Sequence, residues 1–262
     1  MAIRKPAGRS TASRAARASA ESRGAKASTA LRETKASAAL RASVLRANVE
    51  IAKRGLAPFT FGNASAIDRA RGLVVIKPSG VPFAKLKAAD LVVTDLEWRV
   101  VEGKLRPSAD LATHLELYRH WPAVGGVVHT HSHFATVWAQ AGQEIPCYGT
   151  THADYFNGPV PVTREMTAAE IARDYELNTG KVIVERFDGE PTTMPAVLVA
   201  GHASFVWGPT VDAAVETASI LEEVARMAYH TAILNPATEQ IAQALLHKHF
   251  RRKHGPGAYY GQ

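Results

Sequence analysis

Two histidines in the middle of the chain have the residue type and spacing of metal ligands. His129 and His131 end a short apolar run that begins at Gly125 and is typical of a buried strand. Side chains two residues apart on a strand point the same way, and neutral imidazole is a common ligand of zinc and similar ions. The pair therefore predicts a metal site; the alternative is that both histidines are simply hydrogen-bonded within the fold.

A catalytic metal site typically takes three protein ligands, so a further histidine is expected at another strand end. His202 fits, because the apolar run Val197–Val199 leads to it through Gly201, which allows a sharp turn. Asp110, at the start of a predicted helix, is a candidate fourth ligand, although its charge would also suit a helix N-terminus without a metal. Cys147 is expected to be a small buried filler.

Three turns of small residues offer free N–H groups that could hold a phosphate, one of them beside a lysine. They are Gly62 with Asn63, Lys77 with Ser79 and Gly80, and Ser108 with Ala109. Each turn alone is ordinary. Their number, together with the predicted metal site, favours a phosphorylated substrate.

The remaining pattern predicts the strands and helices that position these groups. We expect helices at 39–55, 110–120, 132–140, 167–179, 211–234 and 237–250, and strands at 73–76, 91–93, 98–101, 125–131, 182–184 and 197–199. Strands interspersed with helices through both short and long connections indicate a single α/β or α+β domain with a mixed or antiparallel sheet. No Gly-x-Gly-x-x-Gly sequence follows a strand, which argues against a dinucleotide-binding fold.

The composition restricts the class of protein. A length of 262 residues with 46% hydrophobic content is sufficient for one sizeable core. No apolar run reaches the ~18 residues of a membrane span, and a single cysteine fits a reducing compartment. We therefore expect a cytoplasmic protein with no membrane partner.

The net charge of +7 belongs to the start of the chain. Residues 1–41 hold ten Lys or Arg and two acids, which leaves the rest at −1. Residues 1–36 are rich in Ala, Ser and Arg, lack aromatic side chains, and cannot bury enough surface to fold. We expect an inert, disordered tail and no nucleic-acid partner, with a transit peptide or a misassigned start codon as alternatives; the folded domain is predicted at 37–262.

Seven short motifs in order along the chain resemble those of the L-ribulose-5-phosphate 4-epimerases, within the class II aldolase/adducin superfamily. They are Gly62-Asn-Ala-Ser, Lys77-Pro-Ser-Gly, Pro107-Ser-Ala-Asp, His129-Thr-His-Ser, Ala135-Thr-x-Trp-Ala-Gln-Ala-Gly, Gly149-Thr-Thr-His-Ala-Asp-Tyr-Phe, and Lys253-His-Gly followed by Ala-Tyr-Tyr-Gly-Gln. The likeness covers about Ser37 to Gln262. It implies an isomerase built as a single α/β domain, with a central, mostly antiparallel sheet flanked by helices.

The resemblance also implies a role for each matching residue. It implies one divalent ion per subunit, usually Zn2+, bound by Asp110, His129, His131 and His202. It implies proton transfer by Asp154 and Tyr260, and phosphate contacts from Gly62, Asn63, Ser79, Gly80, Ser108 and the backbone at Ala109, with Lys77 close by. The epimerase pattern has Ser-Ser-Asp where this chain has Ser108-Ala109-Asp110, so one hydroxyl is missing from the implied phosphate pocket.

The implied reaction interconverts L-ribulose 5-phosphate and D-xylulose 5-phosphate. Carbon 4 is not adjacent to the carbonyl, so its deprotonation would give no stabilised carbanion. Breaking the C3–C4 bond instead yields the enediolate of dihydroxyacetone and glycolaldehyde phosphate, whose aldehyde turns its other face before the bond re-forms. The resemblance further implies a homotetramer with active sites at subunit interfaces, where Tyr260 near the chain end would be held.

Three other functions stay open. A sugar-phosphate aldolase of the same superfamily, like the fuculose-phosphate aldolases, would cleave without recombining, and typically has Glu where Asp110 stands. A metal-dependent hydrolase also uses His-x-His at a strand end. A non-catalytic, adducin-like binding protein would usually have lost the metal ligands. Asp110 and the pair Asp154 and Tyr260 favour the epimerase.

Overall fold

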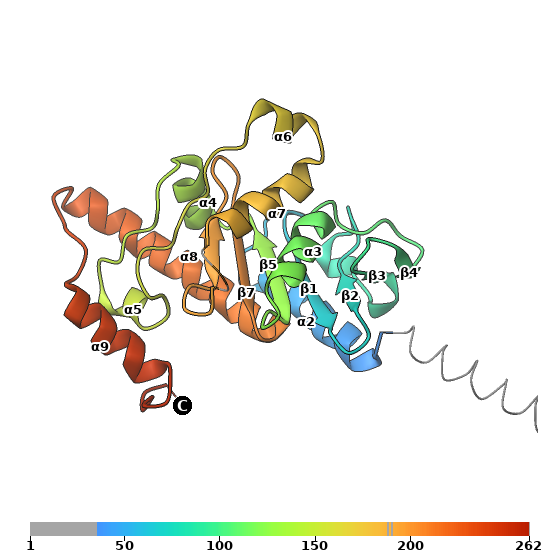
Figure 1. Cartoon of the computed structure of the whole chain (residues 1–262), viewed down its shortest axis with the longest axis horizontal. Helices are drawn as coiled ribbons and strands as arrows, with labels where there is room; N and C mark the ends of the chain where they lie inside the picture. Colours follow the sequence, from blue (N-terminus) through green and yellow to red (C-terminus); the bar gives the residue numbers. More distant parts are fainter. Residues whose placement is uncertain (1–35, 188, 190, 262) are drawn as a thin grey trace, which may run out of the picture. The chain divides into compact units, whose positions relative to one another are not determined.

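A seven-stranded antiparallel sheet forms the centre of the part that the computed structural model describes, residues 36–187, 189 and 191–261 (Figure 1). The predicted tail, apart from Ala36, lies outside these residues. The strand order is β4-β3-β2-β1-β5-β7-β6. The strands are β1 Asn63–Asp68, β2 Leu73–Ile76, β3 Val92–Asp95, β4 Val100–Glu102, β5 Gly126–Thr130, β6 Ala196–Leu198 and β7 Ser204–Gly208. The expectation of an α/β domain with a mostly antiparallel sheet is confirmed.

Helices cover both faces of this sheet. They are α2 Ala38–Lys53, α3 Leu111–His120, α4 His133–Gln140, α5 Thr150–Ala153, α6 Ala168–Ala172, α7 Tyr175–Glu185, α8 Val211–Leu234 and α9 Gln243–Lys253, with short 3-10 turns η1 Phe83–Lys85 and η2 Ala88–Asp90. Helices α2 and α8 pack on one face, whereas α3, with α7 against it, packs on the other (Figure 1). Among the described residues no helix combines the length and apolar character that crossing a membrane requires.

The two faces of the sheet contribute side chains to two separate hydrophobic cores. Val128 and Val206 belong to the core under α2 and α8, while their strand neighbours Val127 and Phe205 belong to the core under α3. Because both faces are covered, the central strands read as continuous apolar runs rather than as an apolar and polar alternation. Polar side chains are therefore left mainly for the strand ends and the loops that follow them.

Most predicted elements are confirmed, and three are wrong in part. Val182–Val184 lie in α7, not in a strand, because Val182 and Ile183 turn toward the buried side of a helix packed on α3. The predicted helix 167–179 is split into α6 and α7 at Asp174, whose φ of 50° is left-handed. The last helix begins at Gln243 rather than at Ala237.

A carboxylate from a distant helix caps α4, the helix that follows His131. Glu222 of α8 accepts hydrogen bonds from the backbone N–H of Phe134 at 2.8 Å and of Ala135 at 3.0 Å. The Ser132 side chain makes no capping bond. The first N–H groups of a helix lack internal partners and favour negative charge, so Glu222 fixes the turn in which the His-x-His segment ends.

We predict that Glu222→Ala lowers the free energy of unfolding by about 1.5 to 3 kcal/mol, the range for hydrogen bonds to a charged group. Urea denaturation measures this difference. Glu223→Ala is the matched control, because the ion pair of Glu223 within the described residues is an exposed one with Arg226, and its loss should change stability by less than about 1 kcal/mol. Equal losses in both variants would contradict a capping role for Glu222.

Candidate functional site

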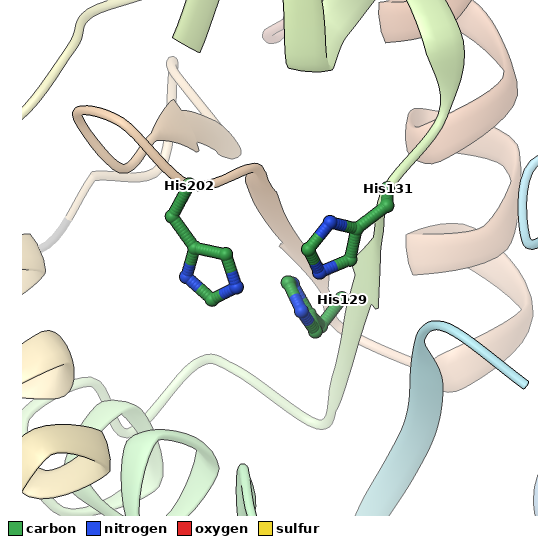
Figure 2. A group of neighbouring side chains, drawn as sticks. All are labelled: His129, His131 and His202. Atoms are coloured by element: carbon green, nitrogen blue, oxygen red, sulfur yellow. The ribbon is translucent and has the colours of Figure 1, made fainter. Parts of the chain in front are cut away.

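Three histidines converge beyond the ends of β5 and β7. His129 is on β5, His131 follows that strand, and His202 lies in the turn between β6 and β7 (Figure 2). Their ring centroids are 4.9 to 5.1 Å apart, and their ligand atoms all lie within 4.8 Å of one another. Within the described residues these three side chains form a group that could hold a metal ion.

The orientation of His129 is set by its neighbours on β7. Its Nδ1 lies 2.9 Å from the carbonyl oxygen of Ser204, and a carbonyl oxygen only accepts, so Nδ1 carries the proton and donates. Its ring stacks on Phe205, with centroids 4.2 Å apart and planes 16° apart. The lone pair is therefore left on Nε2, and a backbone bond of this kind is what fixes the tautomer of a metal-binding histidine.

Burial keeps the other two imidazoles neutral. The pKa of His131 falls from an ordinary value of 6.5 to about 4, first because of burial and then because of the charge of His129. The pKa of His202 falls to about 4 by burial and by the charges of His129 and His131. Neutral imidazole has a free lone pair, which is the form that binds a metal. The donor set thus fits a divalent ion such as Zn2+.

Asp110 is close to the three histidines without being a member of their group. Its negative charge acts on His131 and His202, and its Oδ2 accepts a hydrogen bond from the Asn63 amide at 2.6 Å. Burial alone would raise the pKa of Asp110, but the charges of His129 and His114 and the Asn63 bond bring it below its ordinary value. The carboxylate is therefore ionised, and its metal ligation stays a prediction.

Pairing between strands and turns draws the predicted phosphate residues toward Asp110. Asn63 lies opposite His129 in the β1–β5 pair and donates to Ser108 Oγ at 3.0 Å. The Ser108 N–H donates to the Lys77 carbonyl at 3.0 Å, which joins the turn at 77–80 to the turn at 106–110.

Lys77 is buried beside this carboxylate. Its side chain is only 2% exposed, and its Nζ lies 4.8 Å from the centre of the Phe83 ring. Burial lowers the pKa of Lys77, which the charge of Asp110 partly offsets. Ser79, Gly80 and Ala109 are exposed. The turns thus present one lysine and several small residues next to the site, while phosphate binding itself stays a prediction.

Position 62 requires a glycine, because it lies against the strand that carries His129. Its φ is 101°, a left-handed value, and a Cβ placed there would lie 2.6 Å from the carbonyl oxygen of His129. Any other residue would be strained and would push on the backbone that carries His129. The small residue predicted as a phosphate contact therefore also lets the turn approach the metal-binding strand.

Asp154 and Tyr260 form a second cluster, built from the end of α5, from α9 and from the segment that follows α9. Asp154 is 8% exposed and accepts two hydrogen bonds from the Arg252 guanidinium, at 2.9 and 2.7 Å. The guanidinium carbon lies 4.0 Å from the centre of the Tyr260 ring. Arg252 thus connects the two predicted proton-transfer residues.

This second cluster keeps Asp154 charged. Burial would raise its pKa, but hydrogen bonds from Arg252 and His249 lower it overall. Backbone bonds from Tyr259 and Tyr260 to the Arg252 carbonyl, at 2.8 and 3.0 Å, fasten the chain end to α9. Figure 1 places α5 and α9 together, beyond α8. In the described residues the histidine group does not include Asp154.

Several residues near the site had no role predicted from the sequence. Tyr175, at the start of α7, has its hydroxyl 3.5 Å from Nδ1 of His202. His114 is completely buried, and the charge of Asp110 acts on its ring. Cys147 is a buried free thiol whose pKa burial raises to about 11, in agreement with its predicted role as a filler. No sequence signal pointed to Tyr175, because the left-handed φ of 50° at Asp174, which turns the chain before it, is known only from the structure.

Comparison with known proteins gives the same fold. The family described as Class II Aldolase and Adducin N-terminal domain matches residues 42–229. An L-fuculose 1-phosphate aldolase is 24% identical, over 84% of this chain and 98% of its own, with a TM-score of 0.71. YgbL from Escherichia coli, a putative aldolase/epimerase/decarboxylase, is 22% identical over 80% and 97%, with a TM-score of 0.65. An aldolase II superfamily protein from Pseudomonas syringae is 15% identical over 85% and 90%, with a TM-score of 0.70.

We predict that the purified protein binds about one zinc ion per chain and that His129→Ala abolishes retention, because three convergent ligands are reduced to two. Competition with a chromophoric chelator measures the affinity. His120→Ala is the matched control, since His120 lies on the solvent side of α3 and should leave zinc binding unchanged. Zinc retained by His129→Ala at wild-type affinity would exclude this cluster as the metal site.

The lowered pKa values also predict how stability depends on pH. Between pH 6.5 and about 4 the unfolded chain protonates His131 and His202 whereas the folded chain does not. The unfolded state then binds more protons, so the free energy of unfolding of chelator-treated protein falls as the pH falls through this window. Urea titrations across the range test this, and His202→Asn should give a shallower slope. An unchanged midpoint from pH 6.5 to 4 would contradict it.

Proposed function

This chain belongs to the class II aldolase and adducin N-terminal domain family, and from that premise we propose that it is an L-ribulose-5-phosphate 4-epimerase. The reaction is the interconversion of L-ribulose 5-phosphate and D-xylulose 5-phosphate through reversible cleavage of the C3–C4 bond. The observation that carries the proposal is Arg252, which bonds the Asp154 carboxylate and lies under the Tyr260 ring. Arg252 thereby holds the proposed base, Asp154, and the proposed acid, Tyr260, together in the domain that carries the proposed metal site.

The metal centre in this proposal consists of His129, His131 and His202, with Asp110 as the fourth ligand. A divalent ion held there would act as a Lewis acid on the electrons that leave the C3–C4 bond. Support comes from the tautomer of His129 and from the neutral state of the other two imidazoles. Asp110 adds the single negative charge that the three neutral ligands lack.

The phosphate end of the substrate would lie against the turns that border Asp110. Asn63 and Ser108 already share a hydrogen bond, and Lys77 supplies a positive charge at their side. Gly62, Ser79, Gly80 and the backbone at Ala109 complete the proposed pocket. Its task is to retain the glycolaldehyde phosphate fragment while the aldehyde turns, because a released fragment would end the reaction as a cleavage.

Asp154 and Tyr260 would move the proton at the C4 oxygen. As the bond breaks, the C4 hydroxyl gives its proton to one of them and becomes an aldehyde; as the bond re-forms on the other face, the second group returns a proton to that oxygen. Arg252 and His249 keep Asp154 ionised, so it is the base at neutral pH, and the Tyr260 phenol is the acid. General acid–base catalysis of this kind contributes about 10²- to 10⁴-fold.

We place this pair in the active site of a neighbouring subunit of a homotetramer. The hydrogen-bond partners of the Asp154 side chain in the described part of the chain are Arg252 and His249, and Tyr260 stays 49% exposed. A half-exposed tyrosine near the end of the chain becomes ordered and shielded from water when another copy of the chain covers it. The tail, residues 1–36, has no part in this proposal.

A sugar-phosphate aldolase is the second candidate, since an L-fuculose 1-phosphate aldolase shares the fold. Cleavage alone needs no second proton-transfer group on the opposite face of the aldehyde, so the Asp154 and Tyr260 unit favours the epimerase. The two functions differ in product. The epimerase converts L-ribulose 5-phosphate to D-xylulose 5-phosphate, whereas accumulation of free glycolaldehyde phosphate as the main product would establish the aldolase.

We predict that Asp154→Asn and Tyr260→Phe each bind zinc as the wild type does but lose about 100-fold or more of the epimerase kcat, because each removes one proton-transfer step. A coupled assay for D-xylulose 5-phosphate measures turnover. Tyr259→Phe is the control, since Tyr259 faces Lys248 instead of Arg252 and should retain full activity. Wild-type activity in Tyr260→Phe would remove Tyr260 from the mechanism.

A further inference from the structure

A stripe of polar side chains runs from the metal centre into the core between α3 and β1. Asp110, at the α3 N-cap, His114 and Tyr118 are spaced four residues apart and thus lie on one face of the helix. They meet Asn63 and Ser65, which alternate on one face of β1. We call these five residues the α3–β1 polar ladder.

Hydrogen bonds join the residues of the ladder into two groups, Asn63 with Asp110, and Ser65 with His114 and Tyr118. The Asn63 amide donates to Asp110 at 2.6 Å. The Ser65 hydroxyl lies 2.7 Å from Nδ1 of His114 and 2.8 Å from the hydroxyl of Tyr118.

Burying the polar side chains of this ladder costs free energy that apolar side chains at the same positions would not cost. Ser65 and His114 are 0% exposed and Tyr118 is 1% exposed, in a region otherwise filled by Leu115, Leu117 and their neighbours. Burying polar groups costs free energy even when they are paired, and apolar replacements of similar shape are often neutral or stabilising. A stability role alone therefore does not account for these polar side chains.

One atom of the ladder is buried without a hydrogen-bond partner. Nε2 of His114 has none among the described residues, although Nδ1 of the same ring is bonded to Ser65. The pKa of His114 falls to about 3 through burial, so its ring is neutral and carries a single N–H. Two charged groups also affect the pKa of this ring: Asp110 raises it and His129 lowers it. The ring that carries this unpartnered nitrogen is therefore within electrostatic reach of two of the proposed metal ligands.

The Ser65 hydroxyl lies within hydrogen-bond distance of both Nδ1 of His114 and the Tyr118 hydroxyl, so it can donate to the ring while it accepts from the phenol. In that arrangement the single proton of the His114 ring is on Nε2, which becomes a buried donor one helical turn from the Asp110 carboxylate.

We propose that His114 is a positioning residue for Asp110, whose protonated Nε2 attracts and orients the carboxylate that serves the metal centre. This inference rests on the proposed function, in which Asp110 is a metal ligand. Asn63 binds one carboxylate oxygen of Asp110 from β1. The partial positive charge of the His114 Nε2–H attracts the same carboxylate from one turn further along α3. Electrostatic attraction in a buried site is strong because little water screens it. Interactions behind a ligand of this kind commonly change metal affinity by about 10- to 100-fold when removed.

The test compares two replacements of similar size, His114→Leu and His114→Gln, in the full chain. His114→Leu removes the donor and should weaken zinc binding about 10- to 100-fold in chelator competition, while its thermal midpoint stays equal to or above that of the wild type. His114→Gln keeps an N–H donor near the position of Nε2 and should recover most of that affinity. His120→Leu, on the solvent side of α3, should change neither quantity.

A structural role gives a different pattern. If His114→Leu lowers the thermal midpoint but binds zinc as tightly as the wild type below that midpoint, the positioning role is overturned. If neither His114 variant folds, Tyr118→Phe decides, because loss of its hydroxyl frees the Ser65 and His114 protons and should weaken zinc binding; unchanged affinity overturns the inference. The proposed metal site fails separately, and only if the wild type itself binds no zinc or His129→Ala retains it.

Discussion

Burial of three imidazoles at the ends of neighbouring strands is the constraint on which the rest of the site depends. Low exposure lowers the pKa of His131 and His202 to about 4, so both keep their lone pairs at neutral pH. At His129, Nδ1 donates a hydrogen bond to the Ser204 carbonyl, which orients the ring so that Nε2 is the nitrogen available to a metal. Three lone pairs then face one point next to a single ionised carboxylate, which is an arrangement suited to a divalent cation.

The fold satisfies this constraint by covering both faces of its sheet. With α2 and α8 on one side and α3 on the other, the strand interiors are apolar throughout, and chemistry is confined to strand ends. The register of the β1–β5 pair also contributes. Asn63 lies opposite His129, and this pairing brings α3, Asp110 and the turns of the proposed phosphate pocket to the same edge of the sheet. Glu222 secures the following helix, and Arg252 organises the separate cluster of Asp154 and Tyr260.

Local periodicity was sufficient to predict much of this. Alternation on a strand placed His129 and His131 together, and a glycine before His202 indicated a third arm; the three do converge. Periodicity failed where packing decides the outcome. Val182–Val184 reads as a strand because its residues are β-branched or apolar, yet it is helical because α7 packs on α3. The bonds from Asn63 to Asp110 and from Arg252 to Asp154 join residues 47 and 98 positions apart, which no short pattern reports.

X-ray absorption at the zinc edge of the zinc-loaded full chain reports the ligands of the metal themselves. We expect a first shell of nitrogen and oxygen ligands at about 2.0 to 2.1 Å, with the outer-shell scattering of three imidazoles. The imidazole contribution should fall by one third in His202→Asn. A shell without imidazole scattering, or one that is unchanged in His202→Asn, would contradict a metal centre made by these three histidines.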